Sequence, residues 1–203
     1  SIAEVTARLK AIKELRLSSS ADSVRKKADC PYLFCQIRQH DTEYMIIPRH
    51  TSSDRTYIPL GYLNSDVICG DANNMIPNAS PYMFGVMESK VHMAWMKVVC
   101  GRLGMGYRYS PSVYNNFPWP APNDIQKAKI EKTAQAILDA RNLYPDCSLA
   151  DLYDEVTMPP ELRKAHNDND KAVMEAYGFK VSMTESEVVA ELFNLYKQLT
   201  KEQ

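Results

Sequence analysis

The stretch from Tyr82 to Leu103 reads YMFGVMESKVHMAWMKVVCGRL and decides the fold that we expect. Its apolar side chains recur every three or four residues, which is the spacing of one face of an α-helix. The stripe is broad, as in helices that other elements cover, so the stretch predicts one buried central helix. We expect four of its residues to belong to the core, namely His92, Met93, Trp95 and Met96.

Residues 30–78, before this helix, have a different residue pattern, with short apolar runs separated by Gly, Pro and polar residues. Alternation of apolar and polar side chains is typical of strands that have one buried face. The first two runs flank a polar turn at residues 39–42 and predict a hairpin. The segment therefore predicts a small, loop-rich antiparallel sheet, with strands at residues 32–37, 44–47, 56–60, 65–68 and 73–76.

The two ends of the chain have helical patterns. Apolar residues at helical spacing predict an amphipathic leading helix within residues 1–20, which the serine tract at 18–20 ends. After the proline-rich residues 115–122, capping signals predict helices at 125–143, 149–153, 160–177 and 185–199. The sequence thus predicts an α+β fold with a small antiparallel sheet, a buried central helix and a C-terminal helical bundle, divided as 1–20, 21–120 and 121–203.

Composition places the chain among ordinary globular proteins. It has 203 residues, 45% of them hydrophobic, and a net charge of −1. Residues 1–120 carry 14 basic and 10 acidic side chains, whereas residues 121–203 carry 10 and 15, so a polyanion would favour the first part. Five cysteines without a CxxC pair predict reduced thiols and a cytoplasmic protein. The apolar runs are too short for a membrane span, and the missing initiator Met leads us to expect a fragment.

The usual enzyme motifs are missing from the sequence. Residues 116–119 read NFPW and resemble the Asn-Pro-Pro-aromatic motif that holds a flipped adenine, but they lack the middle proline. A Gly-rich turn that would bind S-adenosylmethionine is also missing. The four histidines have no ligand partner at metal-binding spacing. We therefore predict no catalytic residue and no metal site in this chain.

Three loops of the first part carry side chains suited to nucleic acid. Residues 49–55 offer two arginines, a histidine and three hydroxyls, which are donors that read guanine and contact phosphate. Residues 71–74 present amides that could face adenine, and residues 104–109 place Arg108 between two tyrosines. Solvated loops and simple turns have the same composition, so the residues alone leave both interpretations open.

Long segments of the chain resemble one protein family. The segments are IPRHTSSDR (47–55), YIPLGY (57–62), PYMFGVMES (81–89), HMAWM (92–96), VCGRL (99–103), YRYS (107–110) and YNNFPWP (114–120). Shorter matches follow at residues 140–141, 148–154, 158–162 and 165–166. In this order they resemble the target recognition region and helical tail of MmeI-like restriction-modification DNA methyltransferases, which modify adenine at N6.

This resemblance implies a function for the chain. It would be the module that selects an asymmetric site in double-stranded DNA and presents the site to a methyltransferase domain elsewhere in the parent polypeptide. S-adenosylmethionine would bind that parent domain, and the chain itself would need no cofactor. The resemblance places base recognition at Arg49, His50, Ser52, Asp71, Ala72, Asn73, Gly104, Gly106 and Arg108; we expect phosphate contacts from Lys26, Lys27, Arg55 and Arg102.

The chain departs from its relatives after residues 101–103, where they often carry charged side chains and this sequence has Gly104 and Gly106. A glycine has no side chain to read a base, so either specificity is relaxed there or a neighbour such as Arg108 reads that base pair. Arg102 would hold either a phosphate or an internal salt bridge. Two further hypotheses stay open: a protein-docking module that binds DNA weakly, and an independently active methyltransferase.

Overall fold

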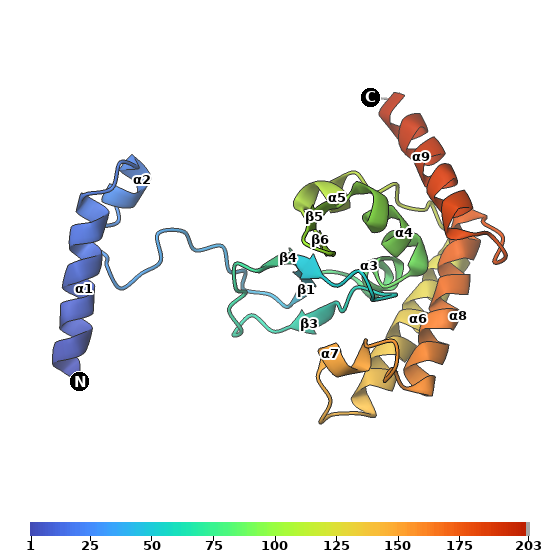
Figure 1. Cartoon of the computed structure of the whole chain (residues 1–203), viewed down its shortest axis with the longest axis horizontal. Coiled ribbons are helices and arrows are strands. Elements are labelled where there is room, and N and C mark those ends of the chain that lie inside the picture. The colour runs from blue at the N-terminus through green and yellow to red at the C-terminus, as the bar shows by residue number, and fades with distance from the viewer. Residues whose placement is uncertain (202–203) are drawn as a thin grey trace. The chain divides into compact units, whose positions relative to one another are not determined.

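The computed structural model describes residues 1–201, which form two compact units, one of residues 1–39 and one that begins at His40 (Figure 1). The first unit contains helices α1 (Ile2–Leu17) and α2 (Asp22–Arg25). Ser1 caps α1 by accepting from the N–H of Glu4, as the predicted leading helix requires. Most apolar residues of α1 are nevertheless exposed within the unit, with Ile2 at 89% and Leu15 at 71%.

The predicted strand at residues 32–37 is wrong, because this segment forms turns and irregular backbone. Arg16 of α1 is buried and explains the difference. Its guanidinium donates to the backbone carbonyls of Lys27, Cys30 and Leu33 at 2.8, 2.7 and 2.5 Å. Those carbonyls fold around one cation, so they cannot form the regular ladder of a strand. The expected hairpin with residues 44–47 does not form.

The second unit begins with a three-stranded antiparallel sheet, which we call sheet A. Its order is β3-β1-β4, and Met45 of β1 faces Tyr62 of β3 on one side and Ile76 of β4 on the other. The predicted strands at 44–47 and 73–76 are confirmed, but the one at 65–68 does not form. The strands are β1 (Tyr44–Pro48), β3 (Gly61–Leu63) and β4 (Asn73–Pro77).

Residues 56–60, which the alternation predicted as a strand, form an irregular segment instead. Ile58 and Leu60 are buried, so the apolar pattern was real. The backbone N–H of Leu60 donates to the Glu88 carboxylate at 2.9 Å, and Pro59 has no N–H to contribute to a ladder. The strand therefore starts only at Gly61.

A second antiparallel sheet, sheet B, has the order β2-β6-β5. It combines β2 (His50–Thr51) with β5 (Gly101–Leu103) and β6 (Gly106–Arg108). The predicted central helix extended to Leu103, so the strand at 101–103 corrects it. The hairpin forms because the chain leaves the helix at Cys100 in extended conformation and turns at Gly104, whose φ is +58°.

The central helix itself consists of two helices, α3 (Pro81–Met87) and α4 (Lys90–Val99). The break lies at residues 88–89, where Ser89 caps α4 by accepting from the His92 N–H. The predicted core assignment is confirmed, since the four named residues of this stretch are all at most 2% exposed. Trp95 donates its indole N–H to the carbonyl of Val113 in α5 (Pro111–Asn115) at 3.1 Å.

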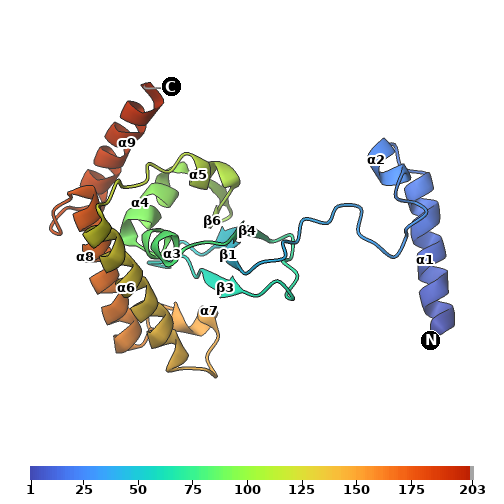
Figure 2. The same cartoon turned by 180° about the vertical axis from the view of Figure 1, so that it is seen from behind.

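The C-terminal helices follow the predicted order. Figures 1 and 2 show α6 and α8 side by side, and these two helices are in contact. Helix α3 packs on α6, and α4 packs on α9. Caps lie at the ends of these helices: Asn123 and Gln126 form a capping box, Gly178 has φ +71°, and Thr184 and Glu187 bond reciprocally. The helices are α6 (Asp124–Asn142), α7 (Leu149–Leu152), α8 (Pro160–Tyr177) and α9 (Glu185–Lys201).

The segment between α5 and α6 is anchored by aromatic rings. Trp119 contacts Tyr114, Phe117 and Tyr82, with ring centroids 5.6, 5.4 and 6.4 Å apart. These ring contacts anchor the proline-rich segment to α3 and α5. The helices after this segment pack on α3 and α4, so the elements from β1 to α9 share one core. A domain boundary at residue 120 stays a prediction.

A buried polar network ties these helices to the sheet region. Arg141 of α6 donates to Glu88 Oε1 and to the Leu60 carbonyl, both at 2.6 Å, and also to the hydroxyl of Tyr153. That hydroxyl already accepts from Arg141, so it donates to His166 Nε2 at 2.7 Å. Burial raises the pKa of Glu88 to about 7 and lowers that of His166 to about 3.

Candidate functional site

Arg49 lies where the chain passes from sheet A to sheet B, and it brings several predicted site residues together. Its backbone N–H donates to the Ala72 carbonyl at 3.0 Å, and its carbonyl accepts from the Tyr109 N–H at 2.8 Å. Its guanidinium donates to the Asp71 carbonyl at 2.8 Å. Segments that are far apart in the sequence, residues 49–50, 71–73 and 108, therefore meet in one place.

Sheet B presents two of these residues side by side. His50 of β2 and Arg108 of β6 are register partners, so their side chains share one face of the sheet, and both are exposed. Arg108 also faces Gly101 of β5, which leaves the surface beside it flat. Neither His50 nor Arg108 has a side-chain hydrogen bond within residues 1–201. Their donors face solvent and are free for a ligand.

The opposite face of sheet B turns toward the core. Thr51 and Tyr107 are register partners there, exposed by 8% and 6%. Arg102 lies over the Tyr107 ring, with its guanidinium carbon 4.1 Å from the ring centroid. Arg102 forms no salt bridge within residues 1–201, and the stacking keeps an exposed cation at the edge of the sheet, so its phosphate contact stays a prediction.

The hairpin turn between β5 and β6 shows what the two glycines do. A side chain at Gly104 would meet open space, but its positive φ favours glycine. A Cβ at Gly106 would lie 2.8 Å from the backbone oxygen of Thr51, so this glycine allows β2 to pair closely. Sequence reasoning missed the exposed Leu103 and Met105 at this turn, at 58% and 84%, because their short apolar run does not distinguish exposed residues from buried ones.

The remaining predicted residues lie elsewhere. Ser52 is exposed, and its hydroxyl bonds to the carboxylate and N–H of Asp54. Arg55 is half-buried and lines a cavity on another part of this unit. Lys26 and Lys27 belong to the first unit, where both are exposed and Lys26 pairs with Asp22 at 2.7 Å. Within the second unit, neither Ser52 nor Arg55 is joined to Arg108 by a hydrogen bond or ion pair among residues 40–201.

Buried groups hold the free face of sheet B in place. Tyr109, directly after Arg108, is 1% exposed, and its hydroxyl lies 3.0 Å from His92 Nε2. The other ring nitrogen of His92 donates to the Met87 carbonyl at 3.0 Å, so Nε2 accepts from Tyr109. Burial lowers the pKa of His92 to about 4. A neutral imidazole therefore anchors β6 to α4.

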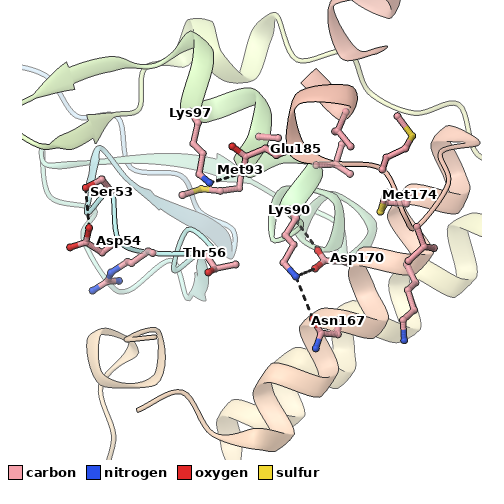
Figure 3. A pocket seen from close by; sticks show the side chains of 17 residues that line it. Ser53, Asp54, Thr56, Lys90, Met93, Lys97, Asn167, Asp170, Met174 and Glu185 are labelled. Carbon is pink, nitrogen blue, oxygen red and sulfur yellow. Dashed lines mark hydrogen bonds and ion pairs between the residues drawn. The ribbon is translucent and has the colours of Figure 1, made fainter. Parts of the chain in front are cut away.

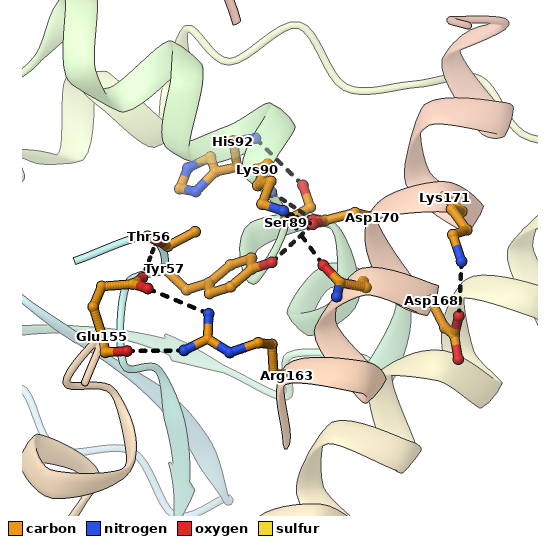
Figure 4. Close-up of polar contacts among 11 residues, drawn as sticks. Thr56, Tyr57, Ser89, Lys90, His92, Glu155, Arg163, Asp168, Asp170 and Lys171 are labelled. Atoms are coloured by element: carbon orange, nitrogen blue, oxygen red, sulfur yellow. Dashed lines mark hydrogen bonds and ion pairs between the residues drawn. The ribbon is translucent and has the colours of Figure 1, made fainter. Parts of the chain in front are cut away.

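A cavity of about 670 Å³ lies between residues 53–56 and helices α4, α8 and α9 (Figure 3). Its amines are already paired, Lys90 with Asp170 at 3.3 Å and Lys97 with Glu185 at 2.7 Å. Figure 4 shows that Asp170 also accepts from the Tyr57 hydroxyl at 2.8 Å. These contacts join neighbouring elements, and they leave few free groups for a ligand.

Contacts around Thr56 hold the same wall of the second unit. Its hydroxyl bonds to the Glu155 carboxylate, which accepts from Arg163 at 3.3 Å (Figure 4). The Tyr57 ring stacks on His166 with centroids 3.9 Å apart. Thus the end of the loop that begins at Arg49 is fastened to α8. The loop residues between them, 52–54, are exposed or half-buried.

Across residues 1–201, groups of three His, Cys, Asp or Glu side chains that would hold a metal are absent. In the same residues, the helices fall short of the length and apolar content needed to cross a membrane. The five cysteines are all free thiols. What the site does offer is a set of exposed hydrogen-bond donors, without an acidic residue between Gly101 and Ser110. Such a surface suits an anionic ligand that carries hydrogen-bond acceptors.

Comparisons with known proteins match the whole chain. Residues 1–121 match the family model "MmeI, target recognition domain", and residues 121–203 match "MmeI, C-terminal domain". "DNA methyltransferase A" of Bacillus subtilis (strain 168) is 34% identical over 195 residues, which are 96% of this chain and 22% of that protein. The structure of the type IIL restriction-modification enzyme MmeI in complex with DNA aligns with a TM-score of 0.90 and 47% identity. The alignment covers 99% of this chain and 28% of MmeI, so this chain spans about a quarter of each relative's length.

Proposed function

We infer the function from the premise that the chain belongs to the MmeI family, with a target recognition domain at residues 1–121 and the family's C-terminal domain after it. The function that the geometry supports best is selection of a specific site in double-stranded DNA. The resemblance of the chain to MmeI in a complex with DNA supports the same ligand. The chain would read the site for a methyltransferase domain of the same parent polypeptide.

The observation that carries this proposal is the free face of sheet B and its neighbouring turn. Arg108 and His50 present unpaired donors side by side, and Arg49 holds the 71–73 turn next to them. Arg bonds to guanine O6 and N7, and Asn bonds to adenine N6 and N7, in the major groove. The groove admits a two-stranded ribbon, and the β5–β6 hairpin is such a ribbon.

Catalysis belongs elsewhere in the parent polypeptide. S-adenosylmethionine sites of methyltransferases use a Gly-rich turn between a parallel strand and a helix. Both sheets within residues 1–201 are antiparallel, so this chain does not fit the cofactor. We assign S-adenosylmethionine and adenine-N6 methylation to the parent's methyltransferase domain. The Bacillus relative of this chain and the chain's free thiols support a location in the bacterial cytoplasm.

A docking role is the second candidate, and one observation favours it. The first unit exposes Ile2, Val5, Leu15, Tyr32 and Phe34 by 57% or more, which is apolar area that a partner surface would cover. This role fits docking on the parent's own catalytic domain. It is compatible with DNA reading by the second unit, because the two features lie on different units.

Selection from a random duplex pool tests the proposed function. The chain would be mixed with the pool at about 50 and 200 mM salt, and the bound fraction sequenced, because phosphate contacts weaken over this range. We expect an enriched motif of several base pairs. Salt-sensitive binding without any motif would favour a docking module that needs the catalytic domain to read DNA. No binding at low salt would reject the DNA-reading function for this chain.

A further inference from the structure

The side chain of Arg49 forms a hydrogen bond within the protein. Besides its two backbone bonds, the guanidinium Nη1 donates to the Asp71 carbonyl at 2.8 Å, and the residue is half-buried. His50 and Arg108 differ, since their side chains are exposed and face solvent. One donor of the Arg49 guanidinium already holds a carbonyl of its own chain, which ties the half-buried side chain to the turn. The position of Arg49 therefore suggests a task other than base reading.

The 71–73 turn needs such support. Asp71 and Ala72 are exposed, and the turn closes on itself through the Asn73 N–H and the Gly70 carbonyl at 3.1 Å. Exposed loops of this kind are the mobile parts of a fold unless other segments hold them. The guanidinium bond is charge-assisted, which is the stronger class of hydrogen bond. It acts one residue beyond the last backbone bond of the β1–β4 strand pair, which joins the Arg49 N–H to the Ala72 carbonyl.

We propose that Arg49 is a positioning residue of the DNA-reading surface: its guanidinium holds the 71–73 turn in register with Arg108 instead of contacting a base. This inference rests on the proposed function, because it assumes that the turn reads DNA. Backbone bonds of Arg49 to Ala72 and Tyr109 set the distance between the two reading segments. The Arg49 side chain then fixes the orientation of the turn, and this orientation decides how Asn73 is presented to the DNA.

Motif selection with four proteins tests this role. They are the wild-type chain, Arg49→Ala, Asn73→Ala and the double variant. We expect Arg49→Ala to lower the preference about tenfold at the base pair that Asn73→Ala also affects, as expected for one lost charge-assisted bond. The double variant should be no worse than Asn73→Ala, because both act through one turn. Preference at the base pair read by Arg108 should persist.

Two further readouts separate positioning from contact and from misfolding. The slope of log K against log salt should equal the wild type, whereas loss of a phosphate contact lowers it by about 0.9. Arg49→Lys should restore most of the preference, because a lysine amine also donates to a carbonyl. A thermal melt of each variant that matches the wild type shows that folding is intact.

Several outcomes would overturn the inference. Loss at a base pair that Asn73→Ala leaves untouched, with additive losses in the double variant, makes Arg49 a direct reader. A reduced salt slope makes it a phosphate contact. A wild-type motif in which no position depends on Asn73 rejects the role while the proposed function stands. A wild type that enriches no motif rejects both.

Discussion

Arg141 and Arg108 carry the same guanidinium group in two regions that use it in opposite ways. Arg141 is 8% exposed, and its three nitrogens donate to Glu88, Tyr153 and the Leu60 carbonyl. Arg108 lies on the open face of sheet B, and its donors face solvent. The comparison teaches that saturated donors hold this fold together, whereas free donors mark the surface that meets a ligand.

Arg141→Met should have the largest effect on stability. The change leaves the buried Glu88 without its cation, and loss of one partner of a buried ion pair costs about 3–5 kcal/mol. Urea denaturation would measure the loss of unfolding free energy. Arg108→Met is the matched control, and we expect a change within about 0.5 kcal/mol at that exposed position. Equal losses in the two variants would break the comparison.

Gly106→Ala should destabilise the chain more than Gly104→Ala does, although both lie in one hairpin. A Cβ at Gly106 would approach the Thr51 backbone oxygen to 2.8 Å, and such crowding costs about 2 kcal/mol. At Gly104 the only obstacle is the positive φ, which costs about 1 kcal/mol. Urea denaturation of both variants gives the order. The reverse order would mean that β2 moves away freely.

Acidification from pH 7 to pH 5 should lower the unfolding free energy by about 2 kcal/mol in total. The folded-state pKa values of His92 and His166, about 4 and 3, lie below the ordinary 6.5, so their stabilisation is lost as pH falls below 6.5. Glu88 acts in the opposite direction, because its pKa is raised to about 7 and its protonation favours the folded state at low pH.

The loss of unfolding free energy from the two histidines exceeds the gain from the Glu88 carboxyl, so the net change is a loss. Denaturation curves at both pH values, at fixed ionic strength, measure the net effect. His50→Gln is the control variant, because this histidine is exposed and lies outside the buried core. Greater stability at pH 5 than at pH 7 would contradict the expected sign.

Arg108→Ala should change which DNA sequences are bound, with an effect confined to one base pair. Loss of one base contact costs about 1–3 kcal/mol of discrimination at a single base pair. Lys26→Ala should instead weaken all sequences alike and lower the salt slope by about 0.9. Anisotropy titrations on a panel of single-base variants of the selected site distinguish the two. Equal losses across the panel for Arg108→Ala would remove it from the reading surface.

The parts of the fold that local signals encode were predicted from the sequence. Helices α6, α8 and α9 begin and end at capping residues that lie within a few positions of one another, such as Asn123 with Gln126. The strand predictions were wrong where a side chain from a distant segment bonds to the backbone. Arg16 bends the segment around Leu33, and Glu88 takes the N–H of Leu60. Alternation predicts burial well, but it does not tell which partner a backbone group will find.

The candidate site shows the same division. Sequence reasoning named Arg49, the 71–73 turn and Arg108 from family resemblance, and the structure places them together. It did not foresee that Arg49 bonds to the turn. Nor did it find the exposed Leu103 and Met105, because an apolar residue in a short run looks the same whether it is buried or free.

The sequence by itself determined the family, the helical caps, the apolar core of residues 81–99 and the loops that carry guanidinium and amide groups. Each of these depends on residues that are close in the chain. Only the tertiary structure decided which donors are satisfied. Arg141 and Arg108 are the same residue type in the sequence. Burial beside Glu88 gives Arg141 a structural role, whereas the open face of sheet B leaves the donors of Arg108 free. The reason is that hydrogen-bond satisfaction depends on contacts between distant segments.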